Sequence, residues 1–166
     1  RSGSGNANNS RLTNTVIDSY NPSSINTRYF WVSLYGRNNR VDHCYFNNQN
    51  HSGVTVVAWL DGVETNHRID NNFFGNRPTG PENGWETIRI GTSGESGTNA
   101  KVIVENNYFY KCDGEIEIIS SKSNDNIYRN NTFEECNGQL TLRHGKRNLV
   151  EGNFFLGRNV SGSSGV

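Results

Sequence analysis

The chain has 166 residues, of which only 32% are hydrophobic, and glycine occurs 18 times. Its 16 basic and 16 acidic residues balance, so no overall field attracts nucleic acid or an anionic membrane surface. No run reaches the roughly 20 apolar residues of a membrane-spanning helix, and the N-terminal RSGSGNANNS lacks the apolar core of a signal peptide.

An irregular internal repeat runs through the chain as an Asn-rich phrase that ends in Phe. A weaker first copy, LTNTVI, ends at Ile17. The later copies end after intervals of 29, 28, 35, 24 and 22 residues, at Phe46, Phe74, Phe109, Phe133 and Phe155. The shortest interval sets the repeating unit, and the longer ones contain loop insertions. Such a unit is too long for one strand and too short for a βαβ unit.

A second alternating strand is predicted ahead of each phrase. The five segments are WVSLY from Trp31, VTVVAW from Val54, ETIRI from Glu86, EIEII from Glu115 and QLTLR from Gln139. Each coil is therefore predicted to contain two strands and two turns. No segment has a sustained apolar pattern at helical spacing, and Gly, Asn, Asp and Ser interrupt the whole chain.

This pattern predicts an all-β protein that folds as a right-handed parallel β-helix, a solenoid of roughly six coils. A β-sandwich is the competing all-β interpretation. The Asn-Asn pairs at equivalent positions favour the solenoid, because Asn tolerates left-handed turns and stacks into ladders. We expect residues 1–166 to form one domain that is incomplete at one or both ends, because neither end shows an evident cap.

The cysteines show no metal-type spacing such as CxxC, which argues against a zinc site. Cys112 and Cys136 each follow the Phe of their own phrase by three residues. They should therefore stack in consecutive coils, at a separation that permits a disulfide. Two free thiols that pack as small hydrophobic groups are an equally good interpretation.

The strand that begins at Glu115 carries acids on one face. Strict alternation directs Glu115 and Glu117 to one side, and Ile116 and Ile118 to the other. Lys122 follows just beyond this strand. The segment therefore combines two carboxylates and an amine.

The strand from Gln139 repeats the alternation, with Leu140 and Leu142 predicted to face inward and Arg143 outward. Neighbouring parallel strands lie about 4.8 Å apart. Stacking would therefore bring both carboxylates, Lys122 and Arg143 into one patch. Each element also has a purely structural interpretation, in which the acids are solvated, the lysine is exposed and the arginine forms a surface ion pair.

Several further side chains are candidates for contact with a ligand. His144 and Arg147 belong to a basic segment without acids, Arg89 is predicted to lie on the outer face, and Tyr35 and Trp59 alternate outward on earlier coils. Arg89 would contact a polymer or pair with a glutamate. The two aromatic rings would stack on sugars or take part in ordinary surface packing.

The segments NGWETIRIG, GEIEIISSKS and LRHG resemble the signature of polysaccharide lyase family 6, which contains alginate lyases and chondroitinase B. The similarity extends from about Leu12 to Gly157. RLTNTVIDSYNP, WVSLYGRNNRVDHCYF and VEGNFFLG resemble the alginate lyase branch. Family members are usually much longer than this chain.

The resemblance implies a parallel β-helix and a Ca²⁺ site whose ligands fall at Asn83, Glu115 and Glu117. The resemblance also implies that the catalytic lysine and arginine of the family fall at Lys122 and Arg143. Calcium prefers carboxylate and amide oxygens, and it would offset the charge that develops during β-elimination from a uronate. Lys122 would be the base, its pKa depressed by Ca²⁺ and Arg143.

The resemblance also implies that Arg143 protonates the departing oxygen. Since arginine is effectively always protonated, we interpret it instead as a stabiliser of negative charge. We therefore expect a secreted or periplasmic bacterial alginate lyase whose export signal is not in this chain, with an anionic polysaccharide as its partner. A dermatan-type lyase would need more cationic residues. A non-catalytic carbohydrate-binding β-helix is the alternative from another class.

Overall fold

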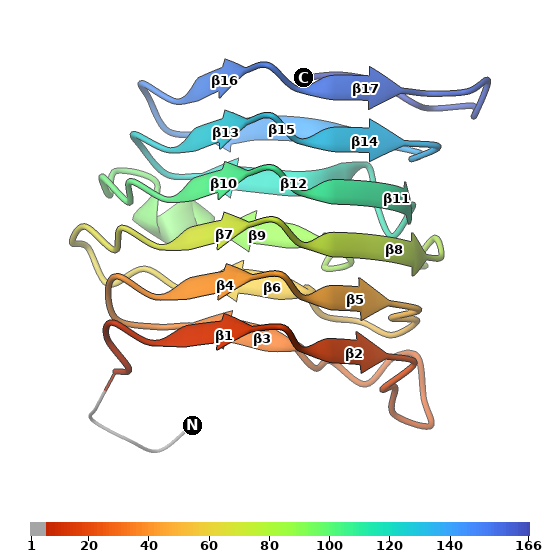
Figure 1. Ribbon diagram of the computed structural model, residues 1–166, viewed down its shortest axis with the longest axis horizontal. Helices are drawn as coiled ribbons and strands as arrows, with labels where there is room; N and C mark the ends of the chain where they lie inside the picture. The colour runs from red at the N-terminus through yellow and green to blue at the C-terminus, as the bar shows by residue number, and fades with distance from the viewer. Residues whose placement is uncertain (1–5) are drawn as a thin grey trace.

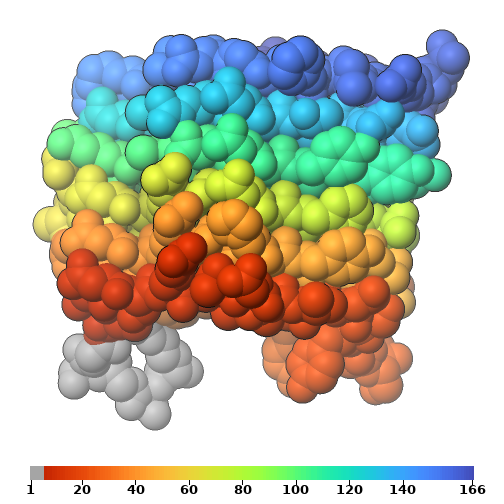
Figure 2. Space-filling model, in the orientation of Figure 1, coloured from red at the N-terminus to blue at the C-terminus, as the bar shows by residue number. Residues whose placement is uncertain are grey.

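The computed structural model describes residues 6–166, and in it the chain winds into a parallel β-helix (Figure 1). Each turn of the chain forms a layer on the previous one, as the colour bands of Figure 2 show. One short 3₁₀ helix, η1 (Ser93–Glu95), lies outside the strands. The predicted fold class is confirmed, although the first five residues of the predicted domain lie outside the described part. No helix in residues 6–166 is long and apolar enough to cross a membrane.

The strands form three parallel sheets. Sheet A consists of β1 (Arg11–Thr13), β4 (Arg40–Asp42), β7 (Arg68–Asp70), β10 (Ile103–Glu105), β13 (Ile127–Arg129) and β16 (Leu149–Glu151). Sheet B consists of β2 (Val16–Asp18), β5 (Tyr45–Asn47), β8 (Phe73–Arg77), β11 (Tyr108–Cys112), β14 (Thr132–Glu134) and β17 (Phe154–Leu156). Sheet C consists of β3 (Val32–Leu34), β6 (Val56–Ala58), β9 (Ile88–Ile90), β12 (Glu117–Lys122) and β15 (Gln139–His144).

A complete coil therefore has three strands, and the prediction of two was wrong. The Asn-rich phrase contains both a sheet A strand and a sheet B strand. A residue with a left-handed backbone separates them, with φ of 55° at Asn71, 55° at Asn106 and 54° at Asn130. Asparagine adopts this conformation more readily than other residues that carry a Cβ atom. The Asn-Asn pair is therefore a sharp corner between two strands.

The Phe residues that end the phrases occupy equivalent positions in sheet B, as predicted. Phe46 pairs with Phe74, which pairs with Phe109, and the series continues through Phe133 to Phe155. Their rings stack with centroid separations between 4.6 and 5.2 Å. This column runs through the hydrophobic core and fixes the register between coils.

The second Asn of each pair forms the predicted ladder inside the coil. The amide group of Asn107 donates to Asn131 Oδ1 at 3.1 Å, and that of Asn72 donates to Asn107 Oδ1 at 2.9 Å. Each of these side chains also donates to a backbone carbonyl, such as Ile69 O from Asn107 at 2.9 Å. Buried polar groups require such partners. The ladder therefore provides hydrogen-bond partners for the buried polar groups at the corners of consecutive coils.

Cys112 and Cys136 stack in consecutive coils, and both are free and buried. The backbone N–H of Cys112 donates to Cys136 Sγ at 3.4 Å. Of the two interpretations that the sequence allowed, the structure has the free thiols.

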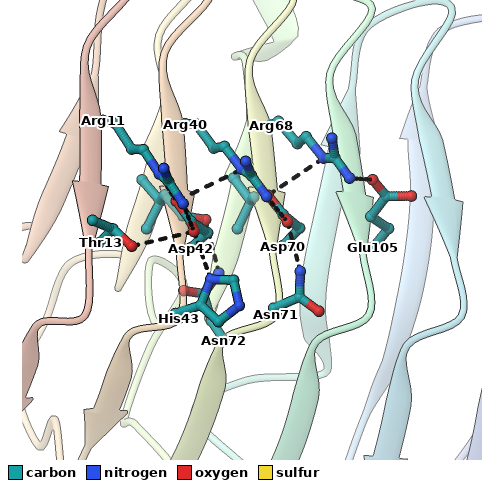
Figure 3. Close-up of polar contacts among 12 residues, drawn as sticks. Arg11, Thr13, Arg40, Asp42, His43, Arg68, Asp70, Asn71, Asn72 and Glu105 are labelled. Carbon is teal, nitrogen blue, oxygen red and sulfur yellow. Dashed lines mark hydrogen bonds and ion pairs between the residues drawn. The ribbon is translucent and has the colours of Figure 1, made fainter.

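The outer face of sheet A carries an ion-pair ladder that crosses several coils (Figure 3). Arg11 pairs with Asp42 at 2.6 Å and Arg40 with Asp70 at 2.6 Å. Two further arginines, Arg68 and Arg129, contact Glu105 at 2.6 Å each. The acids are almost completely covered, and the hydrogen bond from Arg11 lowers the pKa of Asp42 below its usual range. The ladder pairs each buried carboxylate with a guanidinium of a neighbouring strand.

Strict alternation in sheet C was predicted wrongly at three positions. Ile116 is 66% exposed because it precedes β12, and β12 is irregular between Glu117 and Ile119. Strict alternation directs Thr87 to the same outer face as Arg89, two residues later, but Thr87 is buried. Leu142 pairs with the buried Ser121 but is 42% exposed, because β15 is the last strand of sheet C. The predicted inward positions of Ile118 and Leu140 are correct.

Candidate functional site

Three carboxylates meet at the beginning of the strands of sheet C. One oxygen each from Glu86, Glu115 and Glu117 lies within 4.8 Å of the others. Glu86 and Glu117 are buried, and Glu115 is partly buried. Like charges this close repel one another unless cations or hydrogen bonds compensate. The site therefore needs a positive partner.

Backbone amides hold Glu115 in this cluster. The N–H groups of Gly84 and Trp85 donate to Glu115 Oε2 at 2.7 and 3.0 Å. Burial raises the pKa of Glu115, and the charges of Glu86 and Glu117 raise it further, while the two amides act in the opposite direction. The carboxyl group is thus fixed in place but is costly to ionise.

Glu86 was not among the predicted ligands. β9 and β12 pair Ile88 with Ile119, and Glu86 precedes Ile88 by two residues just as Glu117 precedes Ile119. The signal was present in the alternating segment ETIRI, whose first residue is the glutamate. Aligning the strands by their apolar positions would have found it.

Asn83, the predicted amide ligand, is exposed and lies in the turn directly before Gly84. Since the Gly84 amide contacts Glu115, the Asn83 backbone is one residue from the cluster. The structure therefore brings Glu115 and Glu117 together and places Asn83 in the adjacent turn, and the role of all three in metal binding stays a prediction.

A buried arginine supports this turn from inside. Arg77 Nε donates to Trp85 O at 2.7 Å, and Arg77 Nη2 donates to Gly53 O at 2.7 Å. Its guanidinium also lies over the Trp85 ring, 5.4 Å from the centroid. Burial lowers the pKa of Arg77 to about 10, so the group is still a cation at neutral pH. Its position behind the turn places positive charge close to the carboxylates.

The two predicted catalytic residues reach the same cluster. Lys122 Nζ lies 3.8 Å from Glu86 Oε1, and Arg143 Nη1 donates to Glu117 Oε1 at 2.7 Å. The bond to Glu117 raises the pKa of Arg143, which keeps the guanidinium charged. The predicted patch of carboxylates, lysine and arginine therefore exists, while the catalytic roles of its members stay predictions.

A β-bulge explains how neighbouring residues of β15 share this region. The pairing of β12 with β15 shifts so that Lys122 is opposite His144, and Arg143 has no opposite residue. Strict alternation would have directed His144 away from Arg143. His144 is exposed, with Nε2 3.2 Å from Ser93 Oγ in the loop that contains η1. Its predicted contact with polymer is compatible with that exposure.

Arg89, Trp59 and Tyr35 form one stack on the outside of sheet C. The Arg89 guanidinium lies 5.1 Å from the Trp59 ring centroid, and the Trp59 and Tyr35 rings stack at 6.0 Å. Arg89 is only 6% exposed, and its Nη1 is 3.9 Å from Glu86 Oε1. Burial therefore favours the interpretation in which Arg89 balances a glutamate over the one in which it contacts polymer.

Arg147 lies with other partners. It donates to Asp125 Oδ1 at 2.7 Å and to Asn99 Oδ1 at 3.1 Å, between sheets C and A. The basic segment that made Arg147 a candidate for ligand contact therefore does not form one patch. Arg143 pairs with Glu117, whereas Arg147 pairs with Asp125. Within residues 6–166, the partners of Arg147 are Asp125 and Asn99 rather than members of the carboxylate cluster.

The chemistry of the cluster fits a hard divalent cation. Ca²⁺ prefers several oxygen ligands, mostly carboxylates, carbonyls and water. Glu86 Oε2 is buried and has no hydrogen-bond partner among residues 6–166. A buried unpaired carboxylate oxygen is costly, and a bound cation would satisfy it. Glu86, Glu115 and Glu117 would hold the ion, and Asn83 lies in the turn directly before Gly84, whose amide contacts Glu115.

A family model and several solved structures that match this chain are all described as polysaccharide-cleaving enzymes of one kind, the lyases. A family model described as chondroitinase B matches residues 1–166. A mannuronic-acid-specific family 6 polysaccharide lyase from human gut microbiota is 45% identical, with a TM-score of 0.90. The family 6 alginate lyase AlyGC is 47% identical, with a TM-score of 0.89. A family 6 alginate lyase solved in complex with a trisaccharide is 30% identical, with a TM-score of 0.86.

These matches cover nearly all of this chain and a minor part of the others. The alignments include 93%, 91% and 93% of this chain, in the order given above. They include 36%, 21% and 36% of the respective solved chains. The chain thus spans about a third of the length of the gut enzyme and a fifth of AlyGC. A search among curated proteins gave no match.

Proposed function

Because the chain belongs to the chondroitinase B family, that is, polysaccharide lyase family 6, we propose that it cleaves alginate by β-elimination at a Ca²⁺-dependent site. The observation that carries the proposal is the convergence of Lys122 and Arg143 on the three carboxylates. These residues come from three consecutive coils, so their meeting depends on the register of the β-helix. The solved relatives named as alginate lyases support the choice of substrate.

Lys122 is proposed as the base of the reaction. Its neutral amine would take the proton from C5 of the uronate, and the electron pair left behind would form the C4–C5 double bond. The C4–O bond then breaks, and the departing oxygen takes a proton from water. The side chain of Lys122 is 12% exposed, so it is sheltered but accessible from the outer face.

Arg143 is proposed to stabilise negative charge rather than to give up a proton. Its hydrogen bond with Glu117 keeps it protonated, and its side chain is 48% exposed toward the side from which a polymer would approach. A guanidinium can hold a carboxylate through two parallel hydrogen bonds. Arg143 would therefore orient the uronate carboxylate and the departing oxygen.

Ca²⁺ held by Glu86, Glu115 and Glu117 would supply Lewis-acid stabilisation of the charge that spreads onto the sugar carboxylate. The residues themselves supply the rest of the site. The amides of Gly84 and Trp85 keep Glu115 in position, and Arg89 and Arg77 place buried positive charge beside the carboxylates.

The test is incubation with alginate, polymannuronate, polyguluronate and dermatan sulfate, with and without a calcium chelator. The unsaturated uronate product absorbs in the ultraviolet, and we expect its formation from alginate only when calcium is present. Formation from dermatan sulfate instead would favour the chondroitinase branch, which is the branch that gives the family model its description. No product from any polymer, with calcium present, would contradict lyase function of this chain.

Lys122→Ala should reduce the rate by a factor of about 10² to 10⁴, the usual contribution of a general base. Lys101→Ala is the matched control, since Lys101 forms an exposed pair with Glu64 at 2.6 Å. Lys101→Ala should keep the wild-type melting temperature, and a cooperative melting curve checks that Lys122→Ala is folded. Since polymers of this kind are met outside the cell membrane, we also propose that the protein acts there.

A further inference from the structure

The loop between β2 and β3 forms an ordered extension of the first coil, seen beyond β2 in Figure 1. The Tyr29 N–H donates to Ser52 O at 3.0 Å, and the Ser52 N–H donates to Ile25 O at 2.7 Å. Trp31 Nε1 donates to Tyr20 O at 3.0 Å within the loop. These bonds tie the backbone of the loop to the second coil, so the loop has a defined place beside it.

Arg28 in this loop is an exposed cation without an acidic partner. Its guanidinium lies 5.7 Å from the centroid of Phe30, and Phe30 in turn packs edge-on against Trp59 at 5.4 Å. No ion pair joins Arg28 to any acidic side chain among residues 6–166. Most other arginines in the described part of the chain form ion pairs, so Arg28 is unusual in being available to a ligand.

Arg28 lies at the edge of the carboxylate site. A methyl group built on Gly84 would be 3.6 Å from Arg28 Nη2, and the Gly84 N–H donates to Glu115 Oε2 at 2.7 Å. Burial lowers the pKa of Arg89, and the charge of Arg28 adds to that lowering, a second sign that the two guanidinium groups are close. The unpaired guanidinium therefore lies next to Gly84, the residue whose N–H contacts Glu115.

An aromatic hollow lies beside Phe30, the ring over which the Arg28 guanidinium is placed. It has a volume of about 450 Å³ and is lined by side chains that include Tyr20, Tyr29 and Trp31. Aromatic rings with a few polar groups are typical of ligand-binding hollows, and sugar rings pack on such faces. A cation next to one of these rings favours a sugar that carries negative charge.

We propose that Arg28 binds the carboxylate of a second uronate in the polymer, with the aromatic hollow accepting the sugar beyond it. The inference rests on the proposed function, since one polymer chain would occupy both the carboxylate site and this position. A guanidinium matches a carboxylate in geometry as well as in charge. The extra position would bind substrate and would take no part in the chemistry.

The experiment measures binding of hexamannuronate by calorimetry in the Lys122→Ala background, so that the ligand stays intact. Arg28→Ala should weaken binding about tenfold, and Arg28→Lys should weaken it less because the charge remains. Arg158→Ala is the matched control, because Arg158 is an exposed arginine that pairs with Glu134 on another face. Binding of a neutral mannan oligosaccharide should be equally weak in all variants.

Equal affinity of Arg28→Ala and its parent for hexamannuronate would overturn the inference, as would failure of the parent to bind it. Neither result depends on cleavage, so each is separable from a failure of the lyase proposal. Binding that depends on Arg28 in a protein that releases no unsaturated product would support this position and contradict the enzymatic one. Since Arg28 is exposed, the variants should keep the melting temperature of the parent.

Discussion

Arg143 donates a 2.7 Å hydrogen bond to Glu117, although 26 residues separate them in the chain. The first is the proposed charge stabiliser, and the second is a proposed metal ligand. Glu117 therefore has a cation beside it before any metal binds. The guanidinium compensates the crowded carboxylates, but it also repels a divalent ion at the same place.

This arrangement predicts that Arg143→Ala separates metal binding from catalysis. Removing the guanidinium leaves Glu117 free for the ion and removes a like charge from its neighbourhood, so Ca²⁺ affinity should rise roughly three- to tenfold. Lyase activity should fall at least a hundredfold, because the substrate loses its charge stabiliser. Calorimetric titration with Ca²⁺ checks the first effect. Arg147→Ala, whose partner is Asp125, should change neither value.

Glu86→Gln tests the proposed metal ligand that was not predicted from the sequence. Ca²⁺ should raise the melting temperature of the wild-type protein, because a ligand that binds only the folded state stabilises it. The substitution removes one anionic oxygen donor, so this increase should shrink and the Ca²⁺ dissociation constant should rise about tenfold or more. Glu82→Gln alters an exposed acid of the same turn and serves as the control. An unchanged calcium response in Glu86→Gln would exclude Glu86 as a ligand.

Substitutions at the two members of an Asn-Asn corner should differ strongly in their effect on the free energy of unfolding. Asn107→Ala removes a buried side chain that bonds Asn131 and Ile69 O, and it should lower the free energy of unfolding by about 3 kcal/mol. Asn106→Gly should cost almost nothing, because glycine readily adopts the left-handed backbone found there. Urea denaturation of both variants measures the contrast. Similar losses for both would show that the ladder is not the source of the stability.

Stability should fall as the pH decreases from about 6.5 to about 4. Burial lowers the pKa of His67 to about 4, so the folded state resists protonation while the unfolded chain accepts a proton near its ordinary value of 6.5. The folded pKa is the depressed one, so the contribution is present above 6.5 and is lost as the pH falls. It amounts to roughly 3 kcal/mol at most.

His67→Gln should remove this part of the pH dependence, while a glutamine oxygen can still accept the Asn39 N–H that His67 Nδ1 accepts at 3.2 Å. Burial also lowers the pKa of His51. Since the wild-type protein and His67→Gln both contain His51, the difference between their pH dependences of stability is due to His67. Denaturation at several pH values gives the slope. His144→Gln, a change at an exposed position, should retain the wild-type slope.

The sequence predicted the fold because its signals repeat. The Phe column and the Asn ladder each recur once per coil, so a single register explains them all. The predicted two-strand coil was wrong because the phrase reads as one element, whereas the left-handed φ at Asn106 divides it into two strands. Only the backbone conformation distinguishes a bend within a strand from a corner between two sheets.

The site was predictable wherever it followed the alternation of a strand. Glu117 and Arg143 meet as predicted from stacking, and Glu86 could have been found from the same register. The burial of Arg89 against aromatic rings could not be predicted in this way, because Phe30 contacts it from a loop that has no counterpart in the other coils. The bulge at Arg143 depends on hydrogen bonding between two strands, for which a single strand carries no signal.

The unequal intervals of the repeat have a consequence for how such proteins diversify. Thirty-five residues separate Phe74 from Phe109 and only 22 separate Phe133 from Phe155, yet all four belong to one column of stacked rings. Insertions are absorbed at the corners, so a loop can lengthen without displacing the reactive side chains. Substrate preference can thus change by loop exchange while the chemistry is kept, and grafting a loop from a relative between β9 and β10 is a direct route to new specificity.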